Sequence, residues 1–405
     1  MRILWLQQYF ATPAGWGSVR TFEFGRRFVA AGHAVDVLCC AAYDSSLAGQ
    51  GVVEIAGMRV HVSRTQYRPQ MGFFARMRSF LSFACFATGH VLRRGGAYDL
   101  ILASSGPLSM AIPALLARWL HRTPFVFEII DVWPDAAIEA GVLRNRLLRW
   151  FAFRLEACAY RLAIRIVTCS PGMTARVVRK GLAADKVVTI PNCCDLDVFR
   201  PDPGRRAAIR TALGVRDNQF VVLYAGAMGR SNAVDDIVKA AELTADDAPI
   251  VWWFAGDGAD AETLRQVAAG RFFGPLPRMR LVELCQAADA AVVSFHHAPL
   301  FQENSPNKFF DAIAAGLPVV FNRSTWLEPD IANYGCGFVC LDEQPATEMA
   351  ARLLELANDP TLRQRLGAGA RRLAEERFSR DDLGGRYVRV LVAAGGVAHE
   401  TRERR

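Results

Sequence analysis

Apolar residues occur along this chain in short, almost uninterrupted runs, and amphipathic stretches separate one run from the next. Such runs are typical of strands that are buried on both faces of a parallel sheet, while apolar residues spaced by three or four are typical of covering helices. A helix is expected at 18–31. Strands are expected in the first half at 2–8, 34–39, 98–103, 124–130 and 164–169. The first half is therefore predicted to be a doubly wound α/β domain.

The same alternation starts again at Phe220, so a second α/β domain is expected. The boundary falls between residues 191 and 219, where strand periodicity is missing. After the run that begins at Phe220, strands are expected at 250–255, 290–295 and 318–321, and helices at 234–243, 260–268 and 307–315.

Composition is that of a large globular protein. The chain has 405 residues, of which 52% are hydrophobic and 22% charged, so it can form two or three domains. Its 10 cysteines lack the paired C-x2-C spacing of a zinc site, and we interpret them as reduced, mostly buried thiols. We expect no metal and no cofactor. No apolar run reaches the ~18 uncharged residues of a spanning helix, and no signal peptide is recognisable.

Two stretches concentrate the net charge of +8 and mix arginine with aromatic and aliphatic residues, at 73–83 and 144–154. A basic amphipathic helix can lie on an anionic membrane, or it can pack its apolar face on a sheet and leave its arginines solvated. We interpret 73–83 as the membrane-facing helix and 144–154 as the packed one. Nucleic acid is not an expected partner, because no recognisable binding motif is present.

Two acids flank a predicted helix start at the end of the strand 290–295. Ser305 is a good N-cap and Pro306 suits the first helical position, between Glu303 and Asp311. The first-turn N–H groups favour a diphosphate, while the carboxylates can accept hydrogen bonds from sugar hydroxyls. The spacing by itself would also suit a capped surface helix with two solvated acids.

Glycine turns follow two other predicted strands of the second half. Gly226 and Gly229 precede Arg230, whose guanidinium can give bidentate hydrogen bonds to a diphosphate. Residues 256–258 form a Gly-Asp-Gly turn after the strand 250–255. Lys308, in the first turn of the predicted helix 307–315, is expected to supply a second positive charge.

Several of these motifs resemble a known family. Glu303-x7-Asp311 with the Ala-Ala-Gly-Leu-Pro-Val that ends at Val319 resembles the E-x7-E signature of retaining family 4 glycosyltransferases of the GT-B fold. Residues 127–135 resemble the E-x-R-D-L-W-P segment of the bacterial surface-polysaccharide (capsule and O-antigen) subgroup, with Ile130 in place of Arg.

The resemblance implies an α/β GT-B fold, with two Rossmann-like domains facing across a cleft and a C-terminal helix that crosses back to the N-terminal domain. The implied division is an acceptor-side domain at 1–195 with the crossing helix at about 380–394, a nucleotide-sugar donor domain at 196–379, and a tail at 395–405.

The resemblance also implies site roles. The predicted catalytic residues are Glu303, Arg230, Lys308 and Asp131. The predicted donor-binding residues are Gly226, Gly229, Gly256, Asp257, Gly258, Asn304, Ser305, Pro306, Asn307 and Asp311. The predicted acceptor-side residues are Gly15, Trp16, Gly17, Arg20 and Glu128, where Trp16 can stack on an acceptor sugar or act as a hydrophobic plug. In the implied mechanism the leaving β-phosphate takes the acceptor proton, and Asp131 or Glu128 is the alternative base. His296 and His297 are interpreted as structural.

The expected function is metal-independent transfer of a sugar, a hexose or deoxyamino sugar, from a UDP-sugar to a glycan or polyprenyl-linked acceptor. We expect retention of configuration, a role in cell-surface polysaccharide biosynthesis, and a location in the cytoplasm at the membrane face. The alternatives are a GT-B sugar-nucleotide epimerase and a non-catalytic nucleotide-sugar-binding or membrane-scaffold protein.

Overall fold

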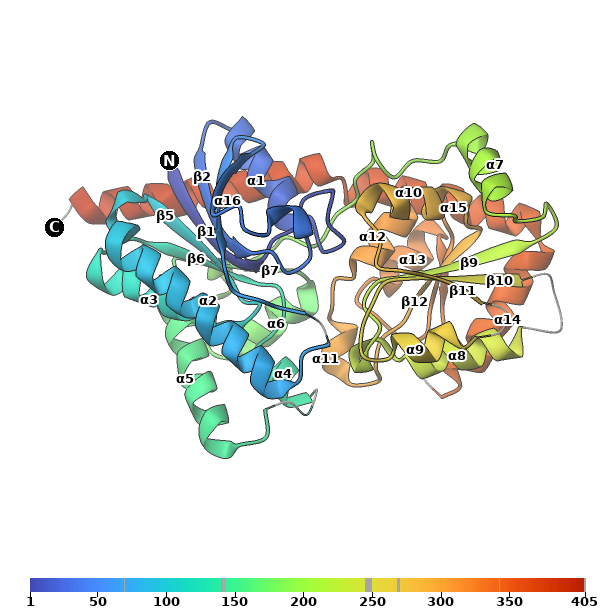
Figure 1. Ribbon diagram of the computed structural model, residues 1–405, viewed down its shortest axis with the longest axis horizontal. Helices are drawn as coiled ribbons and strands as arrows, with labels where there is room; N and C mark the ends of the chain where they lie inside the picture. The colour runs from blue at the N-terminus through green and yellow to red at the C-terminus, as the bar shows by residue number, and fades with distance from the viewer. Residues whose placement is uncertain are drawn as a thin grey trace. The chain divides into compact units, whose positions relative to one another are not determined.

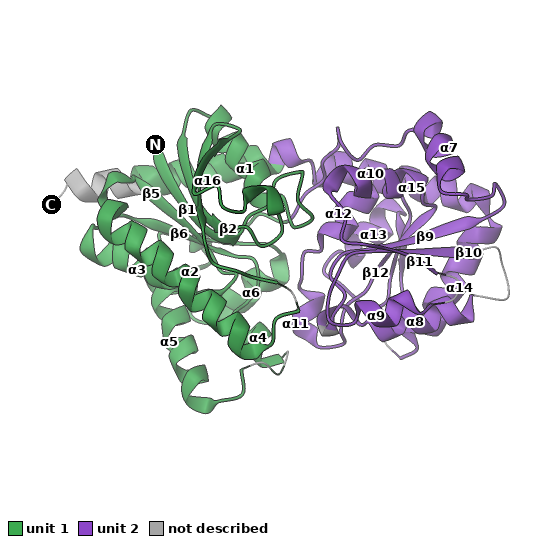
Figure 2. Cartoon of the chain, in the orientation of Figure 1, with its two compact units in different colours: residues 1–191, 383–405 green, residues 192–382 purple. Residues whose placement is uncertain are grey.

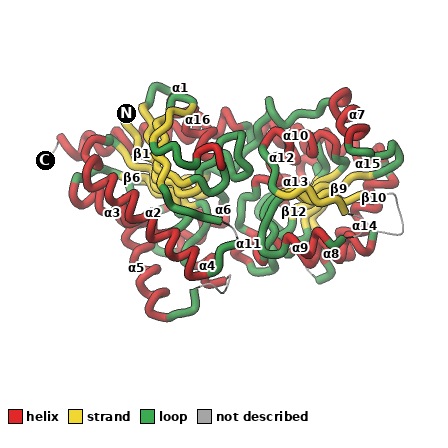
Figure 3. The backbone as a smooth tube through the Cα atoms, viewed as in Figure 1, coloured by secondary structure: helices red, strands yellow, loops and turns green. Residues whose placement is uncertain are grey.

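The computed structural model describes residues 1–68, 70–139, 141, 143–244, 250–267, 270–341 and 343–403, and leaves out the side chains of Arg230 and of residues 397–403. The chain forms two compact units, Met1–Pro191 with Leu383–Arg405, and Asn192–Asp382 (Figure 2). In each unit the strands lie at the centre and helices cover them (Figure 3).

The first unit is built on an eight-stranded sheet with the order β3-β4-β2-β1-β5-β6-β7-β8. All neighbours are parallel except β3, an edge strand that pairs antiparallel with β4. The strands are β1 (Arg2–Tyr9), β2 (Ala34–Cys40), β3 (Val52–Ile55), β4 (Met58–Ser63), β5 (Leu100–Ser104), β6 (Phe125–Ile129), β7 (Arg165–Thr168) and β8 (Val187–Thr189).

The helices of this unit are shown in Figure 1. They are α1 (Arg20–Ala30), α2 (Phe73–Arg94), α3 (Ala111–Leu120), α4 (Asp135–Glu139), α5 (Arg146–Leu162) and α6 (Pro171–Arg179), with 3-10 turns η1 (Ser45–Leu47), η2 (Gly95–Ala97), η3 (Leu108–Met110) and η4 (Ala184–Lys186). The last helix, α16 (Arg380–Glu403), enters this unit at Leu383. Its Tyr387 is fully buried and packs edge-on against Phe24 and Phe28, which together with Trp5 form an aromatic core.

The second unit contains a six-stranded, entirely parallel sheet with the order β11-β10-β9-β12-β13-β14. Its strands are β9 (Phe220–Ala225), β10 (Ile250–Ala255), β11 (Gly270–Gly274), β12 (Ala290–Val293), β13 (Val319–Phe321) and β14 (Gly337–Val339). Its helices are α7 (Pro203–Ala212), η5 (Arg230–Asn232), α8 (Val234–Leu243), α9 (Ala261–Arg265), α10 (Arg278–Ala287), α11 (Pro299–Gln302), α12 (Asn307–Ala314), α13 (Glu328–Tyr334), α14 (Pro345–Asn358) and α15 (Pro360–Arg377).

The predicted strands are present within about two residues of their expected ends, as continuous apolar runs allow. The short strands β3, β4, β8, β11 and β14 were not predicted. The strand 290–295 is shorter than expected, because after Val293 the backbone turns to other partners. The N–H of Phe295 donates to Asn322 Oδ1 at 2.9 Å, and the N–H of His296 donates to the carbonyl of Ser231 at 3.0 Å.

The interpretation of 144–154 as a helix with a packed apolar face is wrong. In α5 the side chains of Leu147, Trp150 and Phe151 are 63%, 54% and 55% exposed, because the first half of the helix has few neighbours on any side. In α2, Phe80 and Phe83 are buried, while Phe74 at the N-terminal end is 85% exposed and Leu81 and Leu92 are also exposed. Within the described residues, every helix is too short or too polar to cross a bilayer.

Candidate nucleotide-sugar site

Two glycine turns meet at the carboxyl ends of β9 and β10. The N–H of Gly226 donates to the carbonyl of Ala255 at 2.8 Å, and the N–H of Met228 donates to the carbonyl of Asp257 at 2.9 Å. Gly256 has a φ of +142°, and a Cβ there would lie 1.9 Å from the carbonyl oxygen of Gly226. At Gly258 a Cβ would lie 2.0 Å from the carbonyl oxygen of Met228. Glycine is therefore required because the two turns contact each other backbone to backbone.

The helix α12 begins at Asn307, so Pro306 precedes it and does not occupy the first helical position. Its N-cap is Pro306, and no side chain caps the first turn, so the predicted capping role of Ser305 is wrong. Ser305 Oγ instead accepts a hydrogen bond from the N–H of Asn192 at 3.1 Å, and the carbonyl of Ser305 accepts one from Asn192 Nδ2 at 2.6 Å. The hydroxyl is thus engaged by a neighbouring segment rather than by the helix that follows it.

Lys308 joins the first turn of α12 to the glycine turn after β9. Its Nζ donates to Tyr224 Oη at 2.9 Å and to Asn232 Oδ1 at 3.0 Å, and it lies 4.2 Å from the centre of the Tyr224 ring. Gly226 leaves room for it, since a Cβ at that position would lie 3.1 Å from Lys308 Cε. Both hydrogen-bond acceptors of the amine are neutral groups.

The charge of Lys308 is not balanced inside the second unit. In the part of the chain that the structure describes, no carboxylate forms an ion pair with Nζ. Burial against Tyr224 therefore lowers the pKa of Lys308 from its usual value to about 7. An anion placed beside Nζ would restore the charged form, so this amine is suited to a phosphate group.

The other predicted donor-side residues belong to turns and helix ends of the second unit. Glu303 is the half-buried C-cap of α11. The carbonyl of Asn304 accepts a hydrogen bond from Trp326 Nε1 at 2.8 Å, and Asp257 Oδ1 accepts one from the N–H of Gly258 at 2.8 Å. The side chain of Arg230 lies outside the described residues, so its predicted contact with a diphosphate stays a prediction. Gly229 precedes Arg230 in an extended conformation, and Asn307 is exposed.

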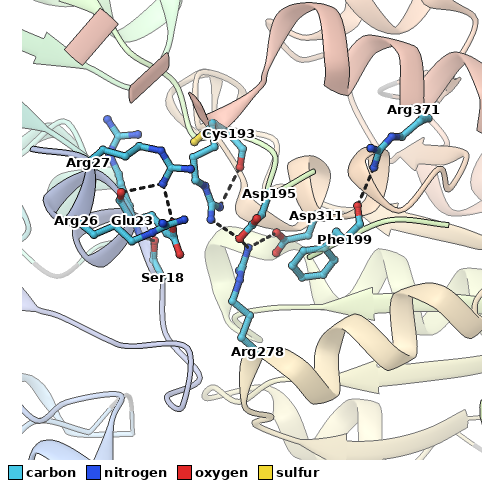
Figure 4. A network of polar contacts seen from close by, with 12 residues as sticks. Ser18, Glu23, Arg26, Arg27, Cys193, Asp195, Phe199, Arg278, Asp311 and Arg371 are labelled. Carbon is cyan, nitrogen blue, oxygen red and sulfur yellow. Dashed lines mark hydrogen bonds and ion pairs between the residues drawn. The ribbon is translucent and has the colours of Figure 1, made fainter. Parts of the chain in front are cut away.

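Asp311 lies deeper than the other acid. Its side chain is buried in a cluster of charges, where Oδ1 is 3.4 Å from Nη2 of Arg278 (Figure 4). The same Nη2 is 3.5 Å from Asp195 Oδ2, and Arg380 Nη1 is 2.6 Å from that oxygen. Burial raises the pKa of Asp311, and the two arginines act in the opposite direction.

Sequence reasoning missed the partners that define these two positions. Tyr224 and Asn232 hold Lys308, while Arg278 and Asp195 hold Asp311. Asn232 follows directly after the Gly-Arg-Ser turn and could have been considered with it. His296 contributes its backbone N–H to Ser231, and its ring lies 4.0 Å from that of His297.

Two predicted acceptor residues of the first unit form an internal ion pair. Arg20 Nε donates to Glu128 Oε1 at 3.0 Å, and its two terminal nitrogens donate to the carbonyls of Pro191 and Ile190 at 2.9 Å each. Glu128 is 0% exposed, and its second oxygen accepts from Ser104 Oγ at 2.5 Å. Both groups are buried and paired, and their predicted contact with an acceptor stays a prediction.

The remaining predicted first-unit residues range from buried Gly15 to exposed Asp131. Asp131 is exposed just after β6, where its carbonyl accepts a hydrogen bond from Ser105 Oγ at 3.0 Å. Trp16 is half-buried, and the centre of its ring lies 4.7 Å from that of Tyr43. The backbone N–H of Trp16 donates to the Tyr43 carbonyl at 3.0 Å. Gly15 and Gly17 fit closely against Tyr43, since a Cβ at either would lie under 3 Å from it. The loop therefore packs on Tyr43.

Comparison with known families identifies both halves. Residues 17–193 match the glycosyl transferase 4-like domain, and residues 205–373 match the glycosyl transferases group 1 family. The chain carries both domains of a GT-B glycosyltransferase. The predicted α/β GT-B fold is confirmed, and glycosyltransferase is the enzyme class to which both domains belong.

Relatives of these glycosyltransferase domains carry different names. The chain is 28% identical to the probable glycosyltransferase WbjE of Pseudomonas aeruginosa, over 65% of this chain and 66% of WbjE. It is 30% identical to a D-inositol 3-phosphate glycosyltransferase of Streptomyces avermitilis, over 47% of this chain and 43% of that protein. The chain thus spans less than two thirds of the length of these relatives.

A solved structure shows the same fold over the whole length. HepE from Anabaena, solved in complex with UDP and glucose, superposes with a TM-score of 0.73 at 18% identity. The superposition covers 97% of this chain and 100% of HepE.

Proposed function

We propose that this protein transfers a sugar from a nucleoside diphosphate sugar to a hydroxyl of a glycan or lipid-linked acceptor. The observation that carries the proposal is Lys308, a partly buried amine whose partners are Tyr224 and Asn232 and whose charge no described carboxylate balances. The glycosyltransferase domains and the binding of UDP by HepE support a UDP-sugar as the donor.

In the proposed reaction the protein stabilises the charge that develops on the leaving β-phosphate. Lys308, Arg230 and the N–H groups at the start of α12 are the donors, and a preorganised donor of this kind is worth about 3 kcal/mol. Glu303 would accept hydrogen bonds from the donor sugar. The acceptor proton goes to the departing phosphate on the same face of the sugar, so the configuration is retained, and Asp131 would contact the acceptor.

The donor part of the proposal is tested with UDP. A ligand that binds the native state raises the free energy of unfolding by RT ln(1 + [L]/Kd), so UDP should raise the Tm. Lys308→Ala should reduce this rise, whereas Lys239→Ala, a matched change at an exposed lysine of α8, should leave it unchanged. An equal response of all three proteins to UDP would contradict the proposed site.

The acceptor part is tested by transfer. Because one relative is named D-inositol 3-phosphate glycosyltransferase, that compound is the first acceptor to compare. The resemblance of residues 127–135 favours instead an acceptor of surface-polysaccharide synthesis. We propose the latter. Labelled product from UDP-[14C]glucose with undecaprenyl-diphosphate sugars, and none with D-inositol 3-phosphate, is the expected result. The reverse pattern, or a changed sugar nucleotide with no acceptor present, would contradict it.

We further propose that the protein works in the cytoplasm at an anionic membrane surface and that α5 provides the contact. Its first half exposes Leu147, Trp150 and Phe151, and the stretch 144–155 contains four arginines without an acidic residue. Exposed apolar side chains can be buried in the headgroup region, and each cation adds about 1 kcal/mol of attraction to anionic lipid.

Vesicle sedimentation tests this contact. The protein should sediment with phosphatidylglycerol vesicles at low salt, and Trp150→Ser with Phe151→Ser should reduce binding strongly. Leu243→Ser with Leu341→Ser, a double change at exposed residues of the second unit, is the matched control. Binding that survives the α5 change, or that is absent from native protein, would contradict the proposal.

A further inference from the structure

The second acid of the E-x7-D motif is held inside the second unit. Asp311 is 7% exposed, and Arg278 lies between it and Asp195, with one guanidinium nitrogen 3.4 Å and 3.5 Å from the two carboxylates. Arg380 adds a second contact to Asp195, at 2.6 Å. Each of the two buried carboxylates thus has a guanidinium nitrogen within 3.5 Å, and such pairing offsets the cost of keeping a charge in a low-dielectric interior.

The segment 192–199 is linked to Ser305 and to α12 at three points, at two of them through an arginine. Before the helix, Asn192 binds both the hydroxyl and the carbonyl of Ser305. In the middle, Asp195 reaches Asp311 through Arg278. At the end, Arg371 Nη1 donates to the carbonyl of Ala314 at 2.6 Å and to that of Phe199 at 3.0 Å (Figure 4). The segment 192–199 is therefore linked to the residues before α12, to its middle through Arg278 and to its end through Arg371.

Lys308 depends on the same placement of α12. It lies three residues before Asp311, which is about 4.5 Å along the helix axis. Its contacts with Tyr224 and Asn232, at 2.9 Å and 3.0 Å, would be lost if the helix shifted by about one ångström. The position of Lys308 Nζ therefore also depends on the contacts that hold the helix at Asp311 and Ala314.

We propose that Asp311 is a positioning residue, which holds α12 and Lys308 in place through Arg278 and Asp195, and that it does not bind the nucleotide ribose. The second acid of the E-x7-E signature is associated with the ribose, but here that acid is one methylene shorter, buried and paired. The proposal rests on the proposed function, since it assumes that the site binds a nucleoside diphosphate.

A ribose analogue separates the two roles of Asp311. Calorimetry would give the Kd of UDP and of 2′-deoxy-UDP for the native protein and for Asp311→Asn, which keeps the size of the side chain. Positioning predicts that UDP binds about tenfold more weakly to the variant, as expected for a lost charged hydrogen bond, while the ratio of the two Kd values is unchanged. The proposal would be overturned if 2′-deoxy-UDP binds the native protein more weakly than UDP does but binds Asp311→Asn with the same Kd as UDP.

A double-mutant cycle tests the route through Arg278. If Asp311 acts through this arginine, Arg278→Gln should weaken UDP binding, and adding it to Asp311→Asn should change the Kd by less than about twofold. Arg280→Gln, at a 61% exposed arginine of the same helix α10, is the control and should have no effect. Additive effects of the two changes would overturn the proposal.

A longer acid gives an independent readout if one of these variants folds poorly. Asp311→Glu restores the residue of the family signature, so a direct ribose contact predicts unchanged or tighter UDP binding. Positioning predicts weaker binding, because the buried cluster has to accommodate an extra methylene. Failure of the native protein to bind UDP would instead contradict the proposed function, and the inference would fall with it.

Discussion

Each unit contains a buried or partly buried cation in the helix that follows one of its parallel strands, and the two cations have opposite surroundings. Arg20 of the first unit pairs with the carboxylate of Glu128 and donates to two backbone carbonyls. Lys308 of the second unit donates only to a phenol and an amide oxygen. A cation that is already neutralised stabilises the fold, whereas a cation with neutral partners keeps its attraction for an anion. Two sheets of similar topology can therefore differ completely in their chemistry.

The largest expected effect is on stability, in the first unit. Arg20→Met leaves the buried carboxylate of Glu128 without its charge partner, which typically costs about 3–5 kcal/mol. Urea unfolding should show this loss in the free energy of unfolding, and adding Glu128→Gln should recover much of it. An unfolding free energy within 1 kcal/mol of the native value would show that Arg20 is not neutralised as described.

The second effect is on activity, in the second unit. Lys308→Met should lower the transfer rate about 100-fold or more, the cost of removing one preorganised donor. It should leave the free energy of unfolding unchanged or slightly higher, since an unbalanced buried charge is removed. Steady-state rates and urea unfolding of the same sample check both parts. A loss of stability without a loss of rate would mean that Lys308, like Arg20, serves the fold and not the reaction.

The third effect is a change of stability and of UDP affinity with pH, which we expect to arise from Lys308. Its folded pKa of about 7 lies below the unfolded value, so between about pH 7 and 10 the unfolded chain binds more protons and this group's contribution to stability rises with pH. A bound diphosphate favours the protonated amine, so UDP affinity should fall by up to about tenfold per pH unit above pH 7. Calorimetry should detect proton uptake in the native protein and none in Lys308→Met.

The smallest effect is expected at the phenol that holds the amine. Tyr224→Phe removes one hydrogen bond to Lys308 and one to the carbonyl of Ala227, and it keeps the ring under the amine. UDP should bind a few-fold more weakly, since a hydrogen bond contributes about 1 kcal/mol. A change as large as that of Lys308→Met would mean that the phenol itself contacts the ligand.

The sequence predicted those features that depend on neighbours along the chain. Buried strands such as β10 are continuous apolar runs, and Lys308 was recognised because it follows the strand β12 and occupies the first turn of α12. Contacts between distant segments could not be predicted. Asp311 pairs with Arg278, which lies 33 residues away along the chain, and is linked through it to Asp195, 116 residues away. Arg20 pairs with Glu128, which lies 108 residues away. The exposure of α5 was missed for a related reason, because an apolar helix face does not reveal whether another element covers it.

The most direct test of the central claim is a crystal structure of the protein with UDP. The account predicts a β-phosphate oxygen within hydrogen-bond distance of Lys308 Nζ, about 2.7–2.9 Å for a charge-assisted pair. It also predicts that the phosphate lies beside the turn that contains Gly226. A diphosphate bound elsewhere, with Lys308 still donating only to Tyr224 and Asn232, would contradict it.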